Sequence, residues 1–103
     1  MSSDSDLCFL PAVEQKRLLE ARDVSAVQLL EAQLAQTERA NPCVNAIVTS
    51  TAELARSAAL ASDALGVLEG LTVGVKDLFL TQGVRTTFGS PIYADLRRAC
   101  RAE

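Results

Sequence analysis

The chain has 103 residues, of which 49% are hydrophobic and 22% are charged, and its net charge is −3. This composition is typical of a globular protein with at most one domain, and it argues against a disordered chain. The negative charge and the low aromatic content of 4% argue against a nucleic acid as the main partner, since phosphate binding needs a basic surface and base stacking needs aromatic rings.

The cysteine and histidine content excludes further classes of protein. The sequence holds three widely spaced cysteines (Cys8, Cys43 and Cys100), no CxxC pair and no histidine. We therefore expect no metal site, no other cofactor and no disulfide framework. The acidic N-terminus lacks a signal-peptide pattern, and no apolar run is long enough for a membrane span. These features predict a cytoplasmic protein that has reduced thiols and no membrane partner.

The first half of the chain is predicted to be mainly helical. After a solvated start over residues 1–6, a partial apolar stripe predicts a helix within residues 9–22, with Pro11 at its first position. A clearer helix follows over residues 26–40. Ser25 and Gln28 have the spacing of a capping box at its start. We expect this helix to end before Pro42, because a residue that precedes proline avoids the helical conformation.

Two short β-branched stretches predict strands on either side of a third helix. Residues 44–50 and 70–79 are the strand candidates, and the alanine-rich stretch 51–65 predicts a helix that ends at Gly66. A turn-rich segment follows, and the tail after residue 92 could form a short basic helix. The order helix–strand–helix–strand indicates an α/β fold. Two strands are too few for an independent sheet, so we expect the sheet to be incomplete within these residues.

A lysine lies within the second strand candidate, in the stretch "VGVKD". In a regular strand Lys76 would share a face with Gly74, while Val73, Val75 and Asp77 would face the other way. Two interpretations are open. Lys76 could extend into solvent from the strand end, or it could lose its proton in a larger protein and act as a general base. The pattern alone favours the solvated lysine, because a single lysine is a weak indication.

Other polar residues near this lysine have simpler interpretations. Arg85 is predicted to be a solvated charge, and Thr86 and Thr87 are predicted to form hydrogen bonds within a turn rather than to act in catalysis. The tail arginines (Arg97, Arg98 and Arg101) most simply form a solvated helical face.

A longer run resembles the first signature block of the amidase signature family, which includes bacterial amidases and amidotransferase A subunits. This run reads "GLTVGVKDLFLTQGVRTTFGS" over residues 70–90, and the family pattern reads G-[IL]-P-V-x-V-K-D-x-F-D-T-x-G-V-x-T-[ST]-x-G-S. The upstream part also resembles the family's N-terminal helix pair and first strand. It has the same order of features: a "VS" step, a helix and then "NPCVNAIV". The resemblance extends over about residues 10–95. It implies the N-terminal helices and first strands of an amidase-type mixed α/β sheet.

The resemblance implies hydrolysis of a carbon–nitrogen amide bond by a Ser–cis-Ser–Lys triad. Lys76 matches the catalytic lysine, which acts as the general base. The two triad serines belong to later stretches of the family, so no other catalytic position is carried over, and Ser90 belongs to the first block itself. Thr72 and Leu80 depart from the family's usual proline and aspartate. Residues 96–103 depart from the pattern as well, which suggests a truncated, frame-shifted or fragmentary product.

Two functions from different classes follow from the resemblance. The first is a partial amidase-type domain over residues 1–103, inactive alone because both serines are missing. It would act on a small-molecule amide once a complementary chain or another copy completed it. The alternative is a non-catalytic remnant or interaction module that docks on another chain. In either case we expect marginal stability in isolation, with Val73 and Val75 only partly covered.

Overall fold

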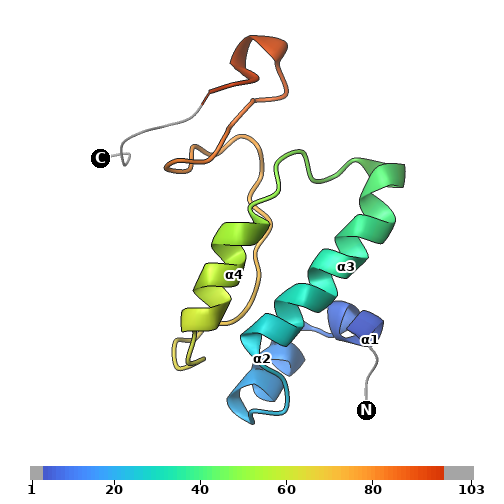
Figure 1. The fold of residues 1–103 in the computed structure, drawn as a ribbon, viewed down its shortest axis with the longest axis vertical. Helices are drawn as coiled ribbons and strands as arrows, with labels where there is room; N and C mark the ends of the chain where they lie inside the picture. Colours follow the sequence, from blue (N-terminus) through green and yellow to red (C-terminus); the bar gives the residue numbers. More distant parts are fainter. Residues whose placement is uncertain (1–3, 97–103) are drawn as a thin grey trace. The chain divides into compact units, whose positions relative to one another are not determined.

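A computed structural model describes residues 4–96 of the chain (Figure 1). The chain divides between Thr72 and Val73 into two compact units, and each is described by itself. The first unit is helical. Its helices are α1 (Asp4–Phe9), α2 (Ala12–Glu20), α3 (Ala26–Val44) and α4 (Ala52–Ala61). The long helix α3 contacts both α1 and α4 (Figure 1).

A small apolar core holds the first unit together. Leu19 of α2 and Leu29 of α3 are its most deeply buried side chains, and Leu7 of α1 packs in the same cluster. The remaining buried members are small residues from α3 and from the segment after α4: Ala26, Ala32 and Ala64. The core therefore joins the helices to the segment that leads toward the predicted lysine block.

The start of α3 confirms the predicted capping box. The Gln28 N–H donates to Ser25 Oγ (3.1 Å), and the Ser25 N–H donates to Gln28 Oε1 (2.9 Å). Two backbone donors that lack partners inside the helix are satisfied in this way. The local sequence therefore fixes where α3 begins.

The predicted end of α3 before Pro42 is wrong, because the helix continues to Val44. Proline removes only one backbone hydrogen bond when it lies in the last turn. Continuation adds a bond from the Asn45 N–H to the Asn41 carbonyl (2.7 Å), and Asn45 closes the helix in the left-handed conformation with φ of 49°. The Asn41 side chain also accepts from the Ile47 N–H (2.9 Å) and donates to the Ile47 carbonyl (3.0 Å).

Two other helix boundaries differ from the prediction. The expected start over residues 1–6 overlaps α1 (Asp4–Phe9): Asp6 is exposed as expected but lies in a helix, whose Leu7 is buried against the core. Helix α4 ends at Ala61, before the predicted stop at Gly66. The side chains of Ser62 and Asp63 accept from the N–H groups two residues further on. Such local bonds compete with helix formation.

The predicted strands over residues 44–50 and 70–79 are absent from the described part of the chain. Residue 44 ends α3, and the rest of both stretches consists of turns, bends and irregular backbone. A strand satisfies its N–H and C=O groups only through a neighbouring strand, and residues 4–96 offer no sheet to join. The described residues therefore show the helices expected from the sequence, and the expected α/β sheet is not found among them.

The second unit is described over residues 73–96. Thr86 is its buried residue, with 2% of its surface exposed, and its N–H donates to the Leu96 carbonyl (3.0 Å). A single 3₁₀ turn, η1 (Pro91–Tyr93), follows the threonines. The rings of Phe88 and Tyr93 meet edge to face with centroids 5.4 Å apart. Residues 97–103, including most of the predicted basic tail helix, lie outside the described residues.

The apolar residues around Lys76 are largely uncovered, which confirms the expectation for the two valines. Val73 is 83% exposed and Val75 is 56% exposed. Within residues 4–96, none of the helices is both long and apolar enough to cross a bilayer.

Candidate functional site

The predicted base, Lys76, lies on an exposed part of the second unit. Its carbonyl accepts from the N–H groups of Leu78 (2.7 Å) and Phe79 (3.1 Å), which makes a tight turn directly after the lysine. A Cβ added at Gly74 would meet no atom within 4 Å. Among residues 4–96, no hydrogen bond or ion pair engages the Lys76 amine. The lysine is therefore accessible, with open space beside Gly74.

The neighbouring carboxylate of Asp77 is held by Thr87, ten residues further along. The Thr87 N–H donates to Asp77 Oδ1 (2.7 Å), and the Thr87 hydroxyl donates to Asp77 Oδ2. The same hydroxyl oxygen accepts from the Gly89 N–H (3.2 Å). Both hydrogen bonds from Thr87 lower the pKa of Asp77. The bond from the hydroxyl has the larger effect, and the bond from the backbone N–H has the next largest. We call this pair of contacts the Asp77–Thr87 clasp.

The other polar residues of the block stabilise its turns. Thr86 and Thr87 form hydrogen bonds within the turn, as predicted. The expectation of a solvated Arg85 is wrong, because this side chain is half-buried and donates to the Ala94 carbonyl (3.0 Å). Ser90 accepts from the Ile92 N–H at the start of η1. The serine of the block therefore has a local structural contact.

Sequence reasoning missed the role of Asp77. A regular strand would have pointed its carboxylate away from Lys76, and no partner was predicted for it. The information was present, since Asp and Thr side chains readily close turns onto backbone N–H groups. A loop of ten residues between them made the partner difficult to choose from the sequence.

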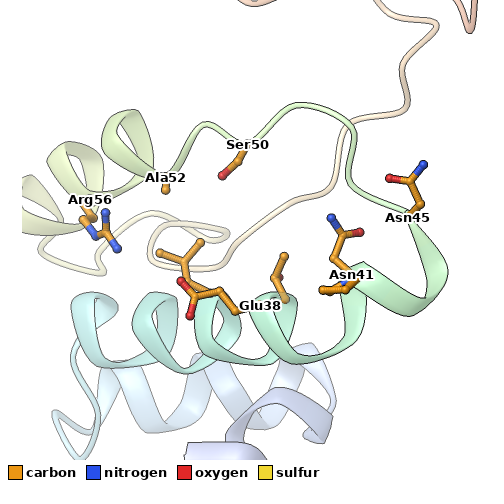
Figure 2. A pocket seen from close by; sticks show the side chains of 9 residues that line it. Glu38, Asn41, Asn45, Ser50, Ala52 and Arg56 are labelled. Carbon is orange, nitrogen blue, oxygen red and sulfur yellow. The ribbon is translucent and has the colours of Figure 1, made fainter.

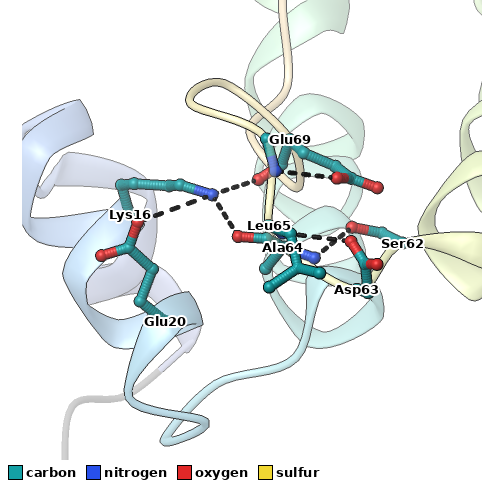
Figure 3. A network of polar contacts seen from close by, with 8 residues as sticks. Lys16, Glu20, Ser62, Asp63, Ala64, Leu65 and Glu69 are labelled. Atoms are coloured by element: carbon teal, nitrogen blue, oxygen red, sulfur yellow. Dashed lines mark hydrogen bonds and ion pairs between the residues drawn. The ribbon is translucent and has the colours of Figure 1, made fainter.

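A network around Lys16 fixes the segment that precedes the lysine block (Figure 3). The Lys16 amine, on α2, donates to the carbonyls of Ala64 (2.7 Å) and Glu69 (3.0 Å). The Glu69 carboxylate accepts from the Gly66 N–H (3.1 Å), and Gly70 approaches the Leu19 side chain closely. The first unit therefore anchors the chain up to Gly70, two residues before the units divide.

A hollow of the first unit lies between the second half of α3 and the start of α4 (Figure 2). Its volume is about 610 Å³. Two of the lining polar side chains are already engaged: Asn41 bonds to Ile47, and Arg56 pairs with Glu31 (2.7 Å) and Glu53 (2.6 Å). Among the described residues, no group of three or more Cys, Asp or Glu side chains could hold a metal ion. The hollow has the character of a packing gap rather than a built ligand site.

The block around Lys76 is therefore the stronger candidate. It presents an accessible amine on a tight turn, and the adjacent carboxylate is occupied by Thr87 instead of pairing with that amine. An amine presented in this way can exchange a proton with a hydroxyl placed beside it. It cannot form an acyl intermediate by this means, since that step needs a nucleophile and donors for the developing oxyanion.

Comparison with known proteins identifies relatives of the chain. The amidase family profile matches residues 28–103. The glutamyl-tRNA(Gln) amidotransferase A subunit from Allorhizobium ampelinum is 46% identical over 88 residues, which cover 80% of this chain and 18% of that protein. The protein of the same name from Sinorhizobium fredii is 42% identical over 99 residues, which cover 90% of this chain and 20% of that protein. A protein of this name from Rhodopseudomonas palustris is 45% identical over 97 residues, which cover 88% of this chain and 20% of that protein.

The matched length is a small part of these relatives. The chain spans about a fifth of the length of the curated proteins that it matches. No solved structure matches the chain.

Proposed function

The chain belongs to the amidase family, and from this premise we propose that residues 1–103 form the base-bearing, N-terminal portion of an amidase-type catalytic domain. The observation that carries the proposal is the family match, which includes the entire lysine block. The exposed Lys76 and the open space beside Gly74 are consistent with it.

In the proposed reaction Lys76 is the general base. Its amine takes the proton of the cis-serine hydroxyl, and that serine takes the proton of the nucleophilic serine as the latter attacks the amide carbonyl. When the C–N bond breaks, the cis-serine gives one proton to the leaving nitrogen and takes a proton back from Lys76. Water then attacks the acyl-serine, releases the acid and returns the serine hydroxyl. Both serines would come from sequence beyond the matched block, and the amide substrate would bind there too. In the complete domain, the stretch that leads into the Lys76 turn would pair as a strand of an α/β sheet.

The relatives' name describes one subunit of an amidotransferase. We therefore also propose that the chain works with a complementary polypeptide that supplies the serines. The apolar side chains around Lys76, among them Val73, Val75 and Phe79, are uncovered. Their burial on assembly would stabilise the complex by about 25 cal/mol per Å² of apolar surface removed from water. Those same side chains favour the second candidate, a non-catalytic module that docks on another chain.

An activity assay separates these alternatives. We expect the 103-residue chain alone to hydrolyse no simple amide, because a base without a nucleophile leaves only residual catalysis. Combined with a serine-bearing amidase portion, it should restore turnover, and Lys76→Ala should lower that turnover by about 10²–10⁴-fold. Arg39→Gln, on the exposed surface of α3, is the control that should retain it.

Two outcomes would contradict the proposal. Turnover by the purified 103-residue chain that disappears in Lys76→Ala would show that the nucleophile lies within these residues. Full activity of Lys76→Ala in the completed enzyme would remove Lys76 from the mechanism. Tight association of the two portions without any turnover would instead support the docking module.

A further inference from the structure

The Asp77–Thr87 clasp lies next to the proposed base. Asp77 follows Lys76 directly, so the two residues share a peptide group, and a constraint on Asp77 constrains the backbone that carries the lysine. The clasp has two points of attachment, one to each carboxylate oxygen. Two-point contacts fix orientation as well as distance.

The backbone on the other side of the clasp is also fixed. The Thr87 hydroxyl oxygen accepts from the Gly89 N–H, and the Thr86 N–H donates to the Leu96 carbonyl (3.0 Å). The Thr86 hydroxyl contacts the Phe79 carbonyl (3.4 Å). Thr87 is therefore held by its neighbours, and Asp77 is attached to a supported group rather than to a free loop.

The clasp also removes the carboxylate from the lysine. An ion pair with a nearby carboxylate would occupy the amine that a base must keep available. Thr87 donates to both carboxylate oxygens, and these hydrogen bonds lower the pKa of Asp77.

We propose that Asp77 is a positioning residue for Lys76: held by Thr87, it fixes the backbone of the lysine and stays out of an ion pair with it. The inference rests on the proposed function of Lys76 as the base. It adds Asp77 and Thr87 to the groups on which turnover depends, although neither touches the substrate.

The first test measures backbone mobility in the isotopically labelled 103-residue chain. We expect the ¹⁵N order parameter of Lys76 to be about 0.85 in the wild type and to fall below about 0.6 in Asp77→Asn and Thr87→Val. Thr87→Ser keeps both donors and should restore the wild-type value. Thr81→Val removes a hydroxyl from the same loop, where none of the clasp bonds involves Thr81, and should change nothing.

The residue at which mobility changes decides between positioning and a purely structural role. A clasp that only closes the loop would lose order over residues 78–86 and leave Lys76 unchanged, and this result would overturn the inference. An equally ordered Lys76 in Thr87→Val and in the wild type would overturn it too. The Thr86 amide signal reports whether each variant is folded; if Asp77→Asn unfolds the unit, the pair Thr87→Val and Thr87→Ser still decides the question.

The second test uses the completed enzyme. Thr87→Val should lower kcat about 100-fold with KM unchanged, because a small misplacement of a reacting group has an effect of this size. Thr87→Ser should recover the activity, and Thr81→Val should keep it. If Lys76→Ala retains full activity, the proposed function fails, and the mobility measurement still tests the clasp. If Lys76→Ala is inactive while Thr87→Val is fully active, only the positioning role fails.

Discussion

The amine of Lys16 links α2 to the segment that leads into the lysine block. It donates to two carbonyls, those of Ala64 and Glu69, and only 12% of its side-chain surface is exposed. A charged donor with so little solvent contact depends on these acceptors. The contact with Glu20, at 4.0 Å, is with an exposed carboxylate and adds little.

Replacement of Lys16 by methionine should destabilise the first unit. Methionine keeps the apolar stem but leaves both carbonyls without their charged donor, which we expect to lower the free energy of unfolding by about 1–3 kcal/mol. Urea titration followed by far-UV circular dichroism measures the change. Arg17→Met is the matched control, since Arg17 pairs with Glu14 on the exposed face. This substitution should change the free energy of unfolding by no more than about 0.5 kcal/mol. Equal effects of the two substitutions would contradict the role assigned to Lys16.

Gly70 occupies a backbone position that excludes a side chain. Its φ is +90°, and an added Cβ would lie 2.9 Å from Leu19 Cδ1 in the core. Gly70→Ala should therefore destabilise the first unit by about 1–3 kcal/mol through backbone strain and the contact with Leu19. Gly66→Ala, four residues earlier, has no positive φ, and its added Cβ would lie 3.2 Å from Glu69 Cβ, which is a less severe approach.

Comparison of the two variants by thermal unfolding tests this account. The midpoint temperature of unfolding of Gly70→Ala should lie clearly below that of Gly66→Ala. The midpoint of Gly66→Ala should stay close to the wild-type value. A Gly70→Ala protein as stable as the wild type would show that the segment after α4 is not held against Leu19 as described.

At the scale of elements, α3 and α4 are joined by an exposed cluster of charges. Arg56 on α4 contacts Glu31 on α3 (2.7 Å) and Glu53 on its own helix (2.6 Å). The hydrogen bond from Arg56 lowers the pKa of Glu31. Because the folded-state pKa is the lower one, this contact stabilises the folded chain at pH values above the ordinary glutamate pKa, about 4.3. The contribution is lost as the pH falls through the folded-state pKa.

Arg56→Gln should therefore raise the pKa of Glu31 toward its ordinary value. A ¹³C carboxyl NMR titration of Glu31 measures the shift directly. The control substitution Arg39→Gln, which removes another exposed arginine that contacts Gln36, should leave the titration of Glu31 unchanged. A Glu31 titration that is identical in Arg56→Gln and the wild type would show that the two helices do not meet through this pair.

Which elements the sequence could predict depends on where their stabilising contacts lie. The start of α3 was predictable because Ser25 and Gln28 are three residues apart and satisfy each other. Its end was not, because the side chain of Asn41 bonds to Ile47 beyond the helix and Asn45 closes it. The helix continues through Pro42 for reasons that lie outside the local pattern.

The candidate site shows the same division. Lys76 was identifiable because the family pattern is continuous in sequence around it. The strand predicted for it was not found, since a strand needs a neighbour that residues 4–96 do not supply. Asp77 and Thr87 were each visible as turn-forming types, but their pairing depends on the path of the loop between them.

At the scale of the whole molecule, the apolar core belongs to one unit. Every buried apolar side chain in the described part of the chain lies before residue 73, as do α1 to α4. The segment 73–96 has a single buried residue, Thr86, and many of its apolar side chains are exposed. The first unit therefore holds the contacts that could make it fold by itself, whereas the second relies on hydrogen bonds within its turns.

A shortened chain tests this division. Residues 1–72 alone should keep the helical circular dichroism signal of the complete chain, compared per molecule, and should unfold at a similar urea concentration. The reason is that every core residue in the described part of the chain lies before residue 73. Leu29→Ala in the short chain serves as the reference for a damaged core, because Leu29 is fully buried. It should lower the free energy of unfolding by about 2–5 kcal/mol. A short chain that loses its helical signal would show that the core needs residues beyond Thr72, and the lysine block would then be part of the folding unit rather than an attachment to it.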